Sequence, residues 1–381
     1  LNATLLRQTK YFDSNLNYSA NQQEYRDNLL NDRSRVEGNG SITWNAIPEF
    51  FSWRVANMRS NQLVDAAGPN TPDNRQIIDY TSTGPIFNLP IGNSTLVNFG
   101  ADYGVVGYEE SRGQEQNRSS YNLSVSRVLT QRLTGSIRSS YTDVDFDNPL
   151  LSAYTFYSLA ANVQLNSEDY TLSAEVGQYN SERFGQSSSH PTFTLSALYR
   201  VNSQFEVSGE YSRSVDDLVS NIEGSGTVDQ FFQDSGPELG NTFGNTNNSN
   251  FYERESQGIG ATYTAESAFS LSLRYTSNQR SSIGLTREEN DERLTANFRL
   301  PLPQQPRLTI NSSAQFSKRS ISAARGIQDR TELRLGANYK LIERLNLTFS
   351  MSNVKQVGDL AIDNFDGLNV SLGLTFTRQA Q

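Results

Sequence analysis

Three aspartates at alternate positions, Asp143, Asp145 and Asp147, form an arrangement that could bind a metal ion. An EF-hand calcium loop begins with carboxylates at this spacing, but it also needs a glycine at position six and a glutamate at position twelve. Tyr154 stands at the twelfth position here, and the glycine is absent. Residues two apart in a strand point to the same side, so the three carboxylates fit a hydrated strand end. We therefore predict no metal site, with a loose cation site on the surface as the alternative.

The chain contains no cysteine and a single histidine, His190, so few residues could act as a thiol nucleophile or as an imidazole acid or base. Without cysteine there is no disulfide scaffold, thiol nucleophile or iron–sulfur cluster. His190 lies in the polar stretch Ser-Ser-Ser-His-Pro, which we expect to be an external loop. A Ser–His–carboxylate site would need a serine placed beside this histidine. We predict no catalytic residue, no enzymatic activity and no cofactor, with a hydrolase that uses His190 as the alternative.

Composition limits the class of protein further. The 381 residues carry 32 Lys and Arg against 41 Asp and Glu, a formal net charge of −9, which argues against nucleic acid as a partner. Hydrophobic residues make up only 35%, yet 10% of residues are aromatic, which is too many for a solvated coil. No run of 18 apolar residues is present, so the sequence predicts no membrane-spanning helix. An all-β protein remains.

Alternation of apolar and polar residues recurs along the chain and is typical of strands with two unlike faces. Near the C-terminus Leu368, Val370, Leu372 and Leu374 alternate with polar or small residues. A soluble β-sandwich also shows such alternation. The lengths of the connections between strands therefore have to distinguish a sandwich from a membrane barrel. Short turns alternate with longer polar segments, as in bacterial outer-membrane barrels. We predict one domain over residues 1–381: an all-β, antiparallel, up-and-down transmembrane β-barrel of about 18 strands, with 16 as the alternative count.

The loop pattern also predicts an orientation in the membrane. The longer segments near 61–78, 183–190 and 217–249 are expected to be extracellular loops. An even number of strands then places both termini in the periplasm. The expected location is the bacterial outer membrane, where lipid and lipopolysaccharide are the surrounding partners.

Aromatic residues gather near the ends of the predicted strands. Trp44, Phe50, Phe51 and Trp53 flank the first short turn. Rings with one polar edge favour the depth of the lipid headgroups, so these residues predict aromatic girdles. Ordinary aromatic strand propensity is the alternative explanation.

The polar faces of the predicted strands should line an aqueous lumen, because side chains cannot fill a barrel of this width. Seven arginines, one lysine and three glutamates are expected there: Arg138, Arg200, Arg274, Arg293, Arg299, Arg307, Arg334, Lys340, Glu175, Glu206 and Glu210. This excess predicts a cationic wall, with the remaining carboxylates largely in external loops. Arginine binds carboxylates in a bidentate manner, which suits anionic solutes or polymers. The alternative is that Arg and Glu on neighbouring strands neutralise each other and rigidify the wall.

One stretch of sequence is more distinctive than the alternation. Residues 44–53 read Trp-Asn-Ala-Ile-Pro-Glu-Phe-Phe-Ser-Trp, residues 63–65 Leu-Val-Asp, residues 70–76 Asn-Thr-Pro-Asp-Asn-Arg-Gln and residues 82–85 Ser-Thr-Gly-Pro. In these motifs the chain resembles the outer-membrane β-barrel family associated with PEP-CTERM/exosortase systems. Members of that family are usually encoded within exopolysaccharide loci of Gram-negative bacteria. The resemblance carries no catalytic residue, and it implies periplasmic polysaccharide-export components as partners.

Taken together, the barrel pattern and the resemblance predict a passive channel for exopolysaccharide or other hydrophilic solutes. The first alternative is a plugged structural barrel whose long loops bind a surface polymer or a partner protein. A sheath that insulates a multihaem cytochrome is a further alternative, one that would leave no mark in the sequence.

Overall fold

The computed structural model describes residues 2–23, 33–63, 75–109, 115–149, 151–183, 185–216, 252–267, 269–282, 288–302, 305–321, 326–342, 345–359 and 364–376. These residues contain no helix that is long and apolar enough to cross a membrane. The described residues form nineteen strands: β1 (Asn2–Gln8), β2 (Phe12–Gln23), β3 (Arg33–Ile47), β4 (Phe51–Leu63), β5 (Arg75–Ile91), β6 (Thr95–Tyr108), β7 (Gln116–Val128), β8 (Leu133–Phe146), β9 (Tyr154–Asn166), β10 (Tyr170–Arg183), β11 (Gln186–Arg200), β12 (Phe205–Asp216), β13 (Tyr252–Thr264), β14 (Ser270–Ser282), β15 (Glu288–Leu302), β16 (Gln305–Ile321), β17 (Gly326–Ile342), β18 (Leu345–Gly358) and β19 (Phe365–Phe376).

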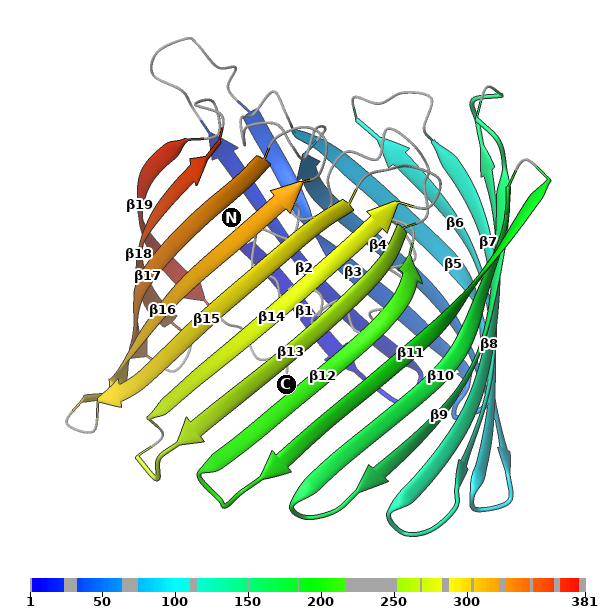
Figure 1. The fold of residues 1–381 in the computed structure, drawn as a ribbon. Coiled ribbons are helices and arrows are strands. Elements are labelled where there is room, and N and C mark those ends of the chain that lie inside the picture. Colours follow the sequence, from blue (N-terminus) through cyan, green and yellow to red (C-terminus); the bar gives the residue numbers. More distant parts are fainter. Residues whose placement is uncertain are drawn as a thin grey trace. The chain divides into compact units, whose positions relative to one another are not determined.

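Consecutive strands pair antiparallel, which makes an up-and-down sheet. β1 to β8 pair in succession. The pairs β11–β12 and β13 through β19 follow the same rule. In Figure 1 the second series runs side by side from yellow-green β13 to red β19. The chain divides into two compact units; the first contains β1 to β8, the second β13 to β19, and the residues of β9, β10 and β11 are divided between them.

The prediction of an all-β, antiparallel, up-and-down fold is confirmed, and the strand count is corrected from 18 to 19. The eighteen predicted strands correspond to β2 through β19, and β1 was missed. Its neighbouring Leu5 and Leu6 break the alternation, and both are exposed. β1 lies antiparallel to β2, with Asn2 opposite Ser19. Both termini were placed in the periplasm because the predicted number of strands was even. Nineteen strands do not support that argument, so the orientation of the termini stays a prediction.

The structure differs from one of the predicted long loops. β10 ends at Arg183 and β11 begins at Gln186, so residues 186–190 belong to a strand and not to a long loop. Gly185, just before β11, has φ of 70°, a left-handed conformation that glycine adopts without strain. Both ends of the loop predicted at 61–78 are strand, because β4 extends to Leu63 and β5 starts at Arg75; the residues between them lie outside the described part of the chain. The loop predicted at 217–249 lies outside the described residues.

Three strand pairs contain a register irregularity at the end that carries the short turn. These irregularities fall between Trp44 and Ile47 in β3, between Pro301 and Leu302 in β15, and between Lys340 and Ile342 in β17. A bulge of this kind takes up an unmatched residue locally. The remaining register of each pair is continuous.

The apolar side of the sheet, called the apolar face below, is exposed. In β19 Leu368, Val370, Leu372 and Leu374 are each between 59% and 73% exposed. Large exposed apolar residues recur on nearly every strand, whereas a soluble protein rarely leaves such a continuous apolar surface uncovered. The apolar face thus has the character of a surface that meets lipid.

Aromatic residues cluster near the short turns, as expected. The ring of Phe87 contacts the rings of Phe50, Phe51 and Phe99, with centroids 4.9–6.4 Å apart. The nearby Trp53 is 42% exposed, and its Nε1 donates to Thr83 Oγ1 over 2.8 Å. An aromatic ring with a satisfied polar edge suits headgroup depth.

The opposite side of the sheet, called the polar face, is not uniformly polar in the first unit. Met58, Ile78, Tyr80 and Val106 pack into a buried cluster on β4, β5 and β6. The register places all four on the polar face, because Met58 pairs with Tyr80 and Tyr80 with Val106. This part of the polar face is therefore apolar and covered.

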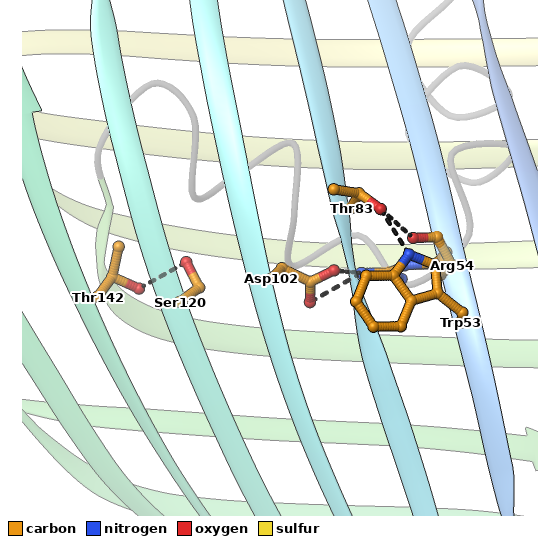
Figure 2. A network of polar contacts seen from close by, with 6 residues as sticks. All are labelled: Trp53, Arg54, Thr83, Asp102, Ser120 and Thr142. Atoms are coloured by element: carbon orange, nitrogen blue, oxygen red, sulfur yellow. Dashed lines mark hydrogen bonds and ion pairs between the residues drawn. The ribbon is translucent and has the colours of Figure 1, made fainter.

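An ion pair in the first unit joins two strands that are separated by a third strand. Arg54 on β4 donates from Nη2 to both carboxylate oxygens of Asp102 on β6, over 3.2 and 3.3 Å (Figure 2). The strand between them presents Gly84, which is paired with Arg54. A Cβ built at Gly84 would lie 1.7 Å from the carbonyl oxygen of Ala101 on β6.

Gly84→Ala should lower the free energy of unfolding by about 1–3 kcal/mol, because the close backbone approach between β5 and β6 leaves no room for a methyl group. Gly100→Ala is the matched control, since its Cβ would have one contact, at 3.9 Å. Urea unfolding in lipid vesicles measures both variants. Equal stability of the two would contradict the steric argument.

Candidate binding groove on the polar face

The register places the predicted lumen residues on the polar face of their own strands. On β14, for example, Arg274 lies between the exposed Leu273 and Tyr275. Ser270 pairs with Arg299 and Ser313 pairs with Arg334, so these arginines share one face across β14 to β17. The same alternation holds for the rest of the predicted set: Arg138, Glu175, Arg200, Glu206, Glu210, Arg293, Arg307 and Lys340. Whether this face lines a lumen stays a prediction.

Most of these charges are paired across or along strands. Arg138 pairs with Glu175, and Arg200 Nε lies 3.5 Å from Glu206 Oε2. Arg274 Nη2 donates to Glu210 Oε1 over 2.7 Å. The alternative of mutual neutralisation is therefore correct for these pairs.

Two carboxylates that the sequence analysis left out also lie on the polar face. Asp291 accepts from Arg293 Nη2 over 3.4 Å, and Glu332 pairs with both Arg330 and Arg334. The expectation of a wall of uncompensated arginines is wrong here, because these buried carboxylates lie beside the arginines and not in external loops. The spacing Arg330-x-Glu332-x-Arg334 was the available signal, since alternate residues of a strand share a face.

The Arg330–Glu332–Arg334 triad fixes the orientation of Arg334. Glu332 is only 4% exposed; its Oε1 accepts from Arg334 Nε, and its Oε2 accepts from Arg330 Nη2 over 3.3 Å. Arg334 thus uses its Nε for the carboxylate, and within the described residues neither of its terminal amino groups has a partner.

A second group of cations has no carboxylate partner within the described part of the chain. It comprises Arg299, Arg307 and Lys340, all toward the short turns. Arg307 Nη1 donates instead to the carbonyl oxygen of Leu341 over 3.4 Å. The net positive charge of this wall therefore comes from fewer residues than predicted.

Polar side chains form two rows across the second unit. Ser270, Arg299, Asn311, Gly336, Ser350 and Ser371 are paired in succession from β14 to β19. One register step away, the second row is Ser272, Asn297, Ser313, Arg334, Ser352 and Asn369. Adjacent strands lie about 4.8 Å apart, so each row is a dense line of hydroxyl, amide and guanidinium groups.

A groove of about 370 Å³ lies over these rows, within the second unit. Nine of its lining residues belong to the polar face: Ser270, Ser272, Asn297, Arg299, Asn311, Ser313, Arg334, Gly336 and Ser350. Asn297 Nδ2 donates to Ser272 Oγ over 3.3 Å. No carboxylate lines this groove, so it combines two cations with neutral hydrogen-bonding groups. We call it the polar groove.

The other residues considered for chemistry lie elsewhere. Asp143 and Asp145 are on β8, and Asp147 Oδ1 accepts from Asn117 Nδ2 over 3.0 Å. No group of three potential metal ligands occurs within the residues that the structure describes. His190 lies on β11 and is half-buried, so the expected external loop is corrected to a strand.

Comparison with known proteins gives a fold and no family. No family model and no curated protein matches this chain, so the resemblance to exosortase-associated barrels stays a prediction. Among solved structures, the siderophore receptor PirA from Pseudomonas aeruginosa is 12% identical, with a TM-score of 0.52 over 97% of this chain and 73% of that one. The FrpB iron transporter from Neisseria meningitidis is 10% identical, with a TM-score of 0.53 over 98% and 78%.

The ferric enterobactin receptor PfeA from Pseudomonas aeruginosa has a TM-score of 0.56 at 10% identity, over 96% of this chain and 68% of that one. At these identities the likeness establishes the fold alone. The chain has the antiparallel, up-and-down fold of outer-membrane β-barrel proteins.

Proposed function

We propose that this protein is an outer-membrane β-barrel that passes hydrophilic solutes, anions before cations, along its polar face. The observation that carries the proposal is the division of the sheet into an exposed apolar face and a polar face with hydroxyl, amide and guanidinium groups. An exposed apolar surface of this kind is stable against lipid, and a polar face opposite to it provides a surface for hydrated solutes.

The solute class that the sequence resemblance implies is exopolysaccharide, moved toward the cell surface by periplasmic export partners. The polar face supports this choice through chemistry, because serine and asparagine can exchange hydrogen bonds with sugar hydroxyls. We propose passive movement, driven by a gradient or by the periplasmic partners.

The wild-type barrel in a planar bilayer should conduct, and its reversal potential across a salt gradient should show anion preference. Unpaired cations in a confined aqueous space raise the local potential and concentrate anions. Arg299→Glu combined with Arg334→Glu should shift the reversal potential toward cation preference. The matched control is Lys318→Glu with Lys355→Glu, the same charge change on the apolar face of β16 and β18. A cation preference that neither pair alters would contradict the proposal.

A plugged structural barrel is the second candidate, and one observation favours it. Val106 and Val144 on the polar face are 0% exposed, and Tyr154 and Phe156 are 3% and 5% exposed. Side chains on the wall of an open aqueous channel would be wet. An absence of conductance in the wild type would select this candidate.

A further inference from the structure

We infer that the polar groove is a binding site for an extended saccharide that carries carboxylate groups, such as a chain of uronic acids. This inference deepens the proposed function and rests on it, since the groove would then be a binding station along the path of the solute. It names the chemical class of the ligand and the residues that select it.

The two arginines of the groove provide the selectivity for acid. Arg299 has no carboxylate partner within the described residues, and Arg334 has its terminal amino groups free there because Glu332 takes only its Nε. A guanidinium with two free N–H groups on one edge binds a carboxylate in a bidentate manner. Glu332 also anchors Arg334, so part of the entropy cost of ordering that side chain is met before a ligand arrives.

The spacing of the arginines favours an extended ligand over a small anion. Arg299 is on β15 and Arg334 on β17, separated laterally by two strand spacings, roughly 10 Å. A single phosphate or acetate would have to draw both side chains together against the Glu332 pair. A polymer with carboxylates at intervals can place one carboxylate beside each arginine without moving either side chain.

The remaining lining groups match sugar hydroxyls. Asn311, Ser313 and Ser270 each present a side-chain donor and acceptor with no partner within the described residues. Hydroxyl and amide groups satisfy donors and acceptors alike, which a polyhydroxylated ring requires. The one aromatic residue among those that line the groove is Phe298, which the register places on the apolar face, opposite Leu271. Recognition therefore rests on hydrogen bonds and charge, without ring stacking.

Gly336 keeps the centre of the groove open. It lies between Asn311 and Ser350 in the first row, and a Cβ built there would have only ordinary contacts, the nearest at 3.6 Å from the carbonyl oxygen of Phe349. A larger side chain fits the backbone and fills the groove. This position gives a test that leaves all charges unchanged.

The test is calorimetric titration of the purified, full-length barrel with trigalacturonate, in parallel with neutral maltotriose and with sodium acetate. We expect trigalacturonate to bind and the other two probes to bind at least tenfold more weakly. Arg299→Gln should weaken trigalacturonate binding about tenfold, the lower end of what one charge-assisted hydrogen bond contributes. Gly336→Leu should abolish binding. Gly367→Leu is the matched control, a glycine on the same face with nothing within 4 Å of its Cβ and outside the groove.

The outcomes separate this inference from the proposed function. Conductance without trigalacturonate binding leaves the channel intact and overturns the acidic-saccharide site. Binding without conductance keeps the site and overturns passive transport. Equal binding of maltotriose, or of acetate, would show that the groove does not select an acidic saccharide. Urea unfolding of each variant identifies any loss of binding that comes from loss of fold.

Discussion

Leu372→Arg should destabilise the barrel in lipid by about 2–4 kcal/mol, the cost of an arginine on the lipid face near the bilayer midplane. Leu372 is 73% exposed on the apolar face of β19. In a soluble protein the same exposure would make the substitution almost neutral, since the arginine would gain water. The sign and size of the effect thus test whether the apolar face meets lipid. The measurement is urea unfolding of protein folded into vesicles.

Thr348→Arg supplies the control for that substitution. Thr348 lies on the polar face of β18 and pairs with Gly373, next to which there is room for a longer side chain. We expect a change below about 0.5 kcal/mol, as for surface positions in general. If Thr348→Arg proved costly and Leu372→Arg harmless, the two faces would be assigned the wrong way round.

Glu332→Gln should lower the free energy of unfolding by about 2–3 kcal/mol. Removing one partner of a fully buried ion pair costs about 3–5 kcal/mol, and the cost here is smaller because the Arg334 side chain is 41% exposed. The substitution leaves Arg330 and Arg334 as neighbouring like charges without their carboxylate. It also removes one negative charge from the polar face, so the anion preference in a bilayer should rise while stability falls.

Glu210→Gln is the matched variant. Its partner Arg274 lies 2.7 Å away, and the two side chains are 43% and 45% exposed. Exposed pairs of this kind contribute about 0–1 kcal/mol. Similar losses for Glu332→Gln and Glu210→Gln would show that burial of the Arg330–Glu332–Arg334 triad adds nothing to stability.

The alternation of apolar and polar residues was sufficient to predict the central part of most strands, but not where the strands end near the loops. In β19 one face is leucine and valine and the other is polar, so period two is visible. The start of β11 is polar on both faces, with serines at 187, 188 and 189, and there the alternation vanishes although the strand continues. β1 was missed for the opposite reason. Its neighbouring residues Leu5 and Leu6 point to opposite faces of the strand, so both faces carry an apolar residue.

The candidate site shows a different limit of sequence reasoning. Face assignment follows from parity within one strand, so the positions of Arg299 and Arg334 could be predicted. Their neighbours could not, because partners across strands depend on register, which turn lengths and bulges determine. The pairing of Arg274 with Glu210 joins residues 64 positions apart. The spacings Asp291–Arg293 and Arg330–Glu332–Arg334, in contrast, each lie on one strand and were readable from the sequence.

The irregularities beside the short turns have a consequence for how this chain can change in length over evolution. An added or lost residue within a strand exchanges its two faces from that point onward. At Pro301–Leu302 and at Lys340–Ile342 the pairing is already out of step, so an insertion there can be absorbed within the bulge. The hairpins β15–β16 and β17–β18 can thus gain or lose residues while every side chain of the polar groove keeps its neighbours.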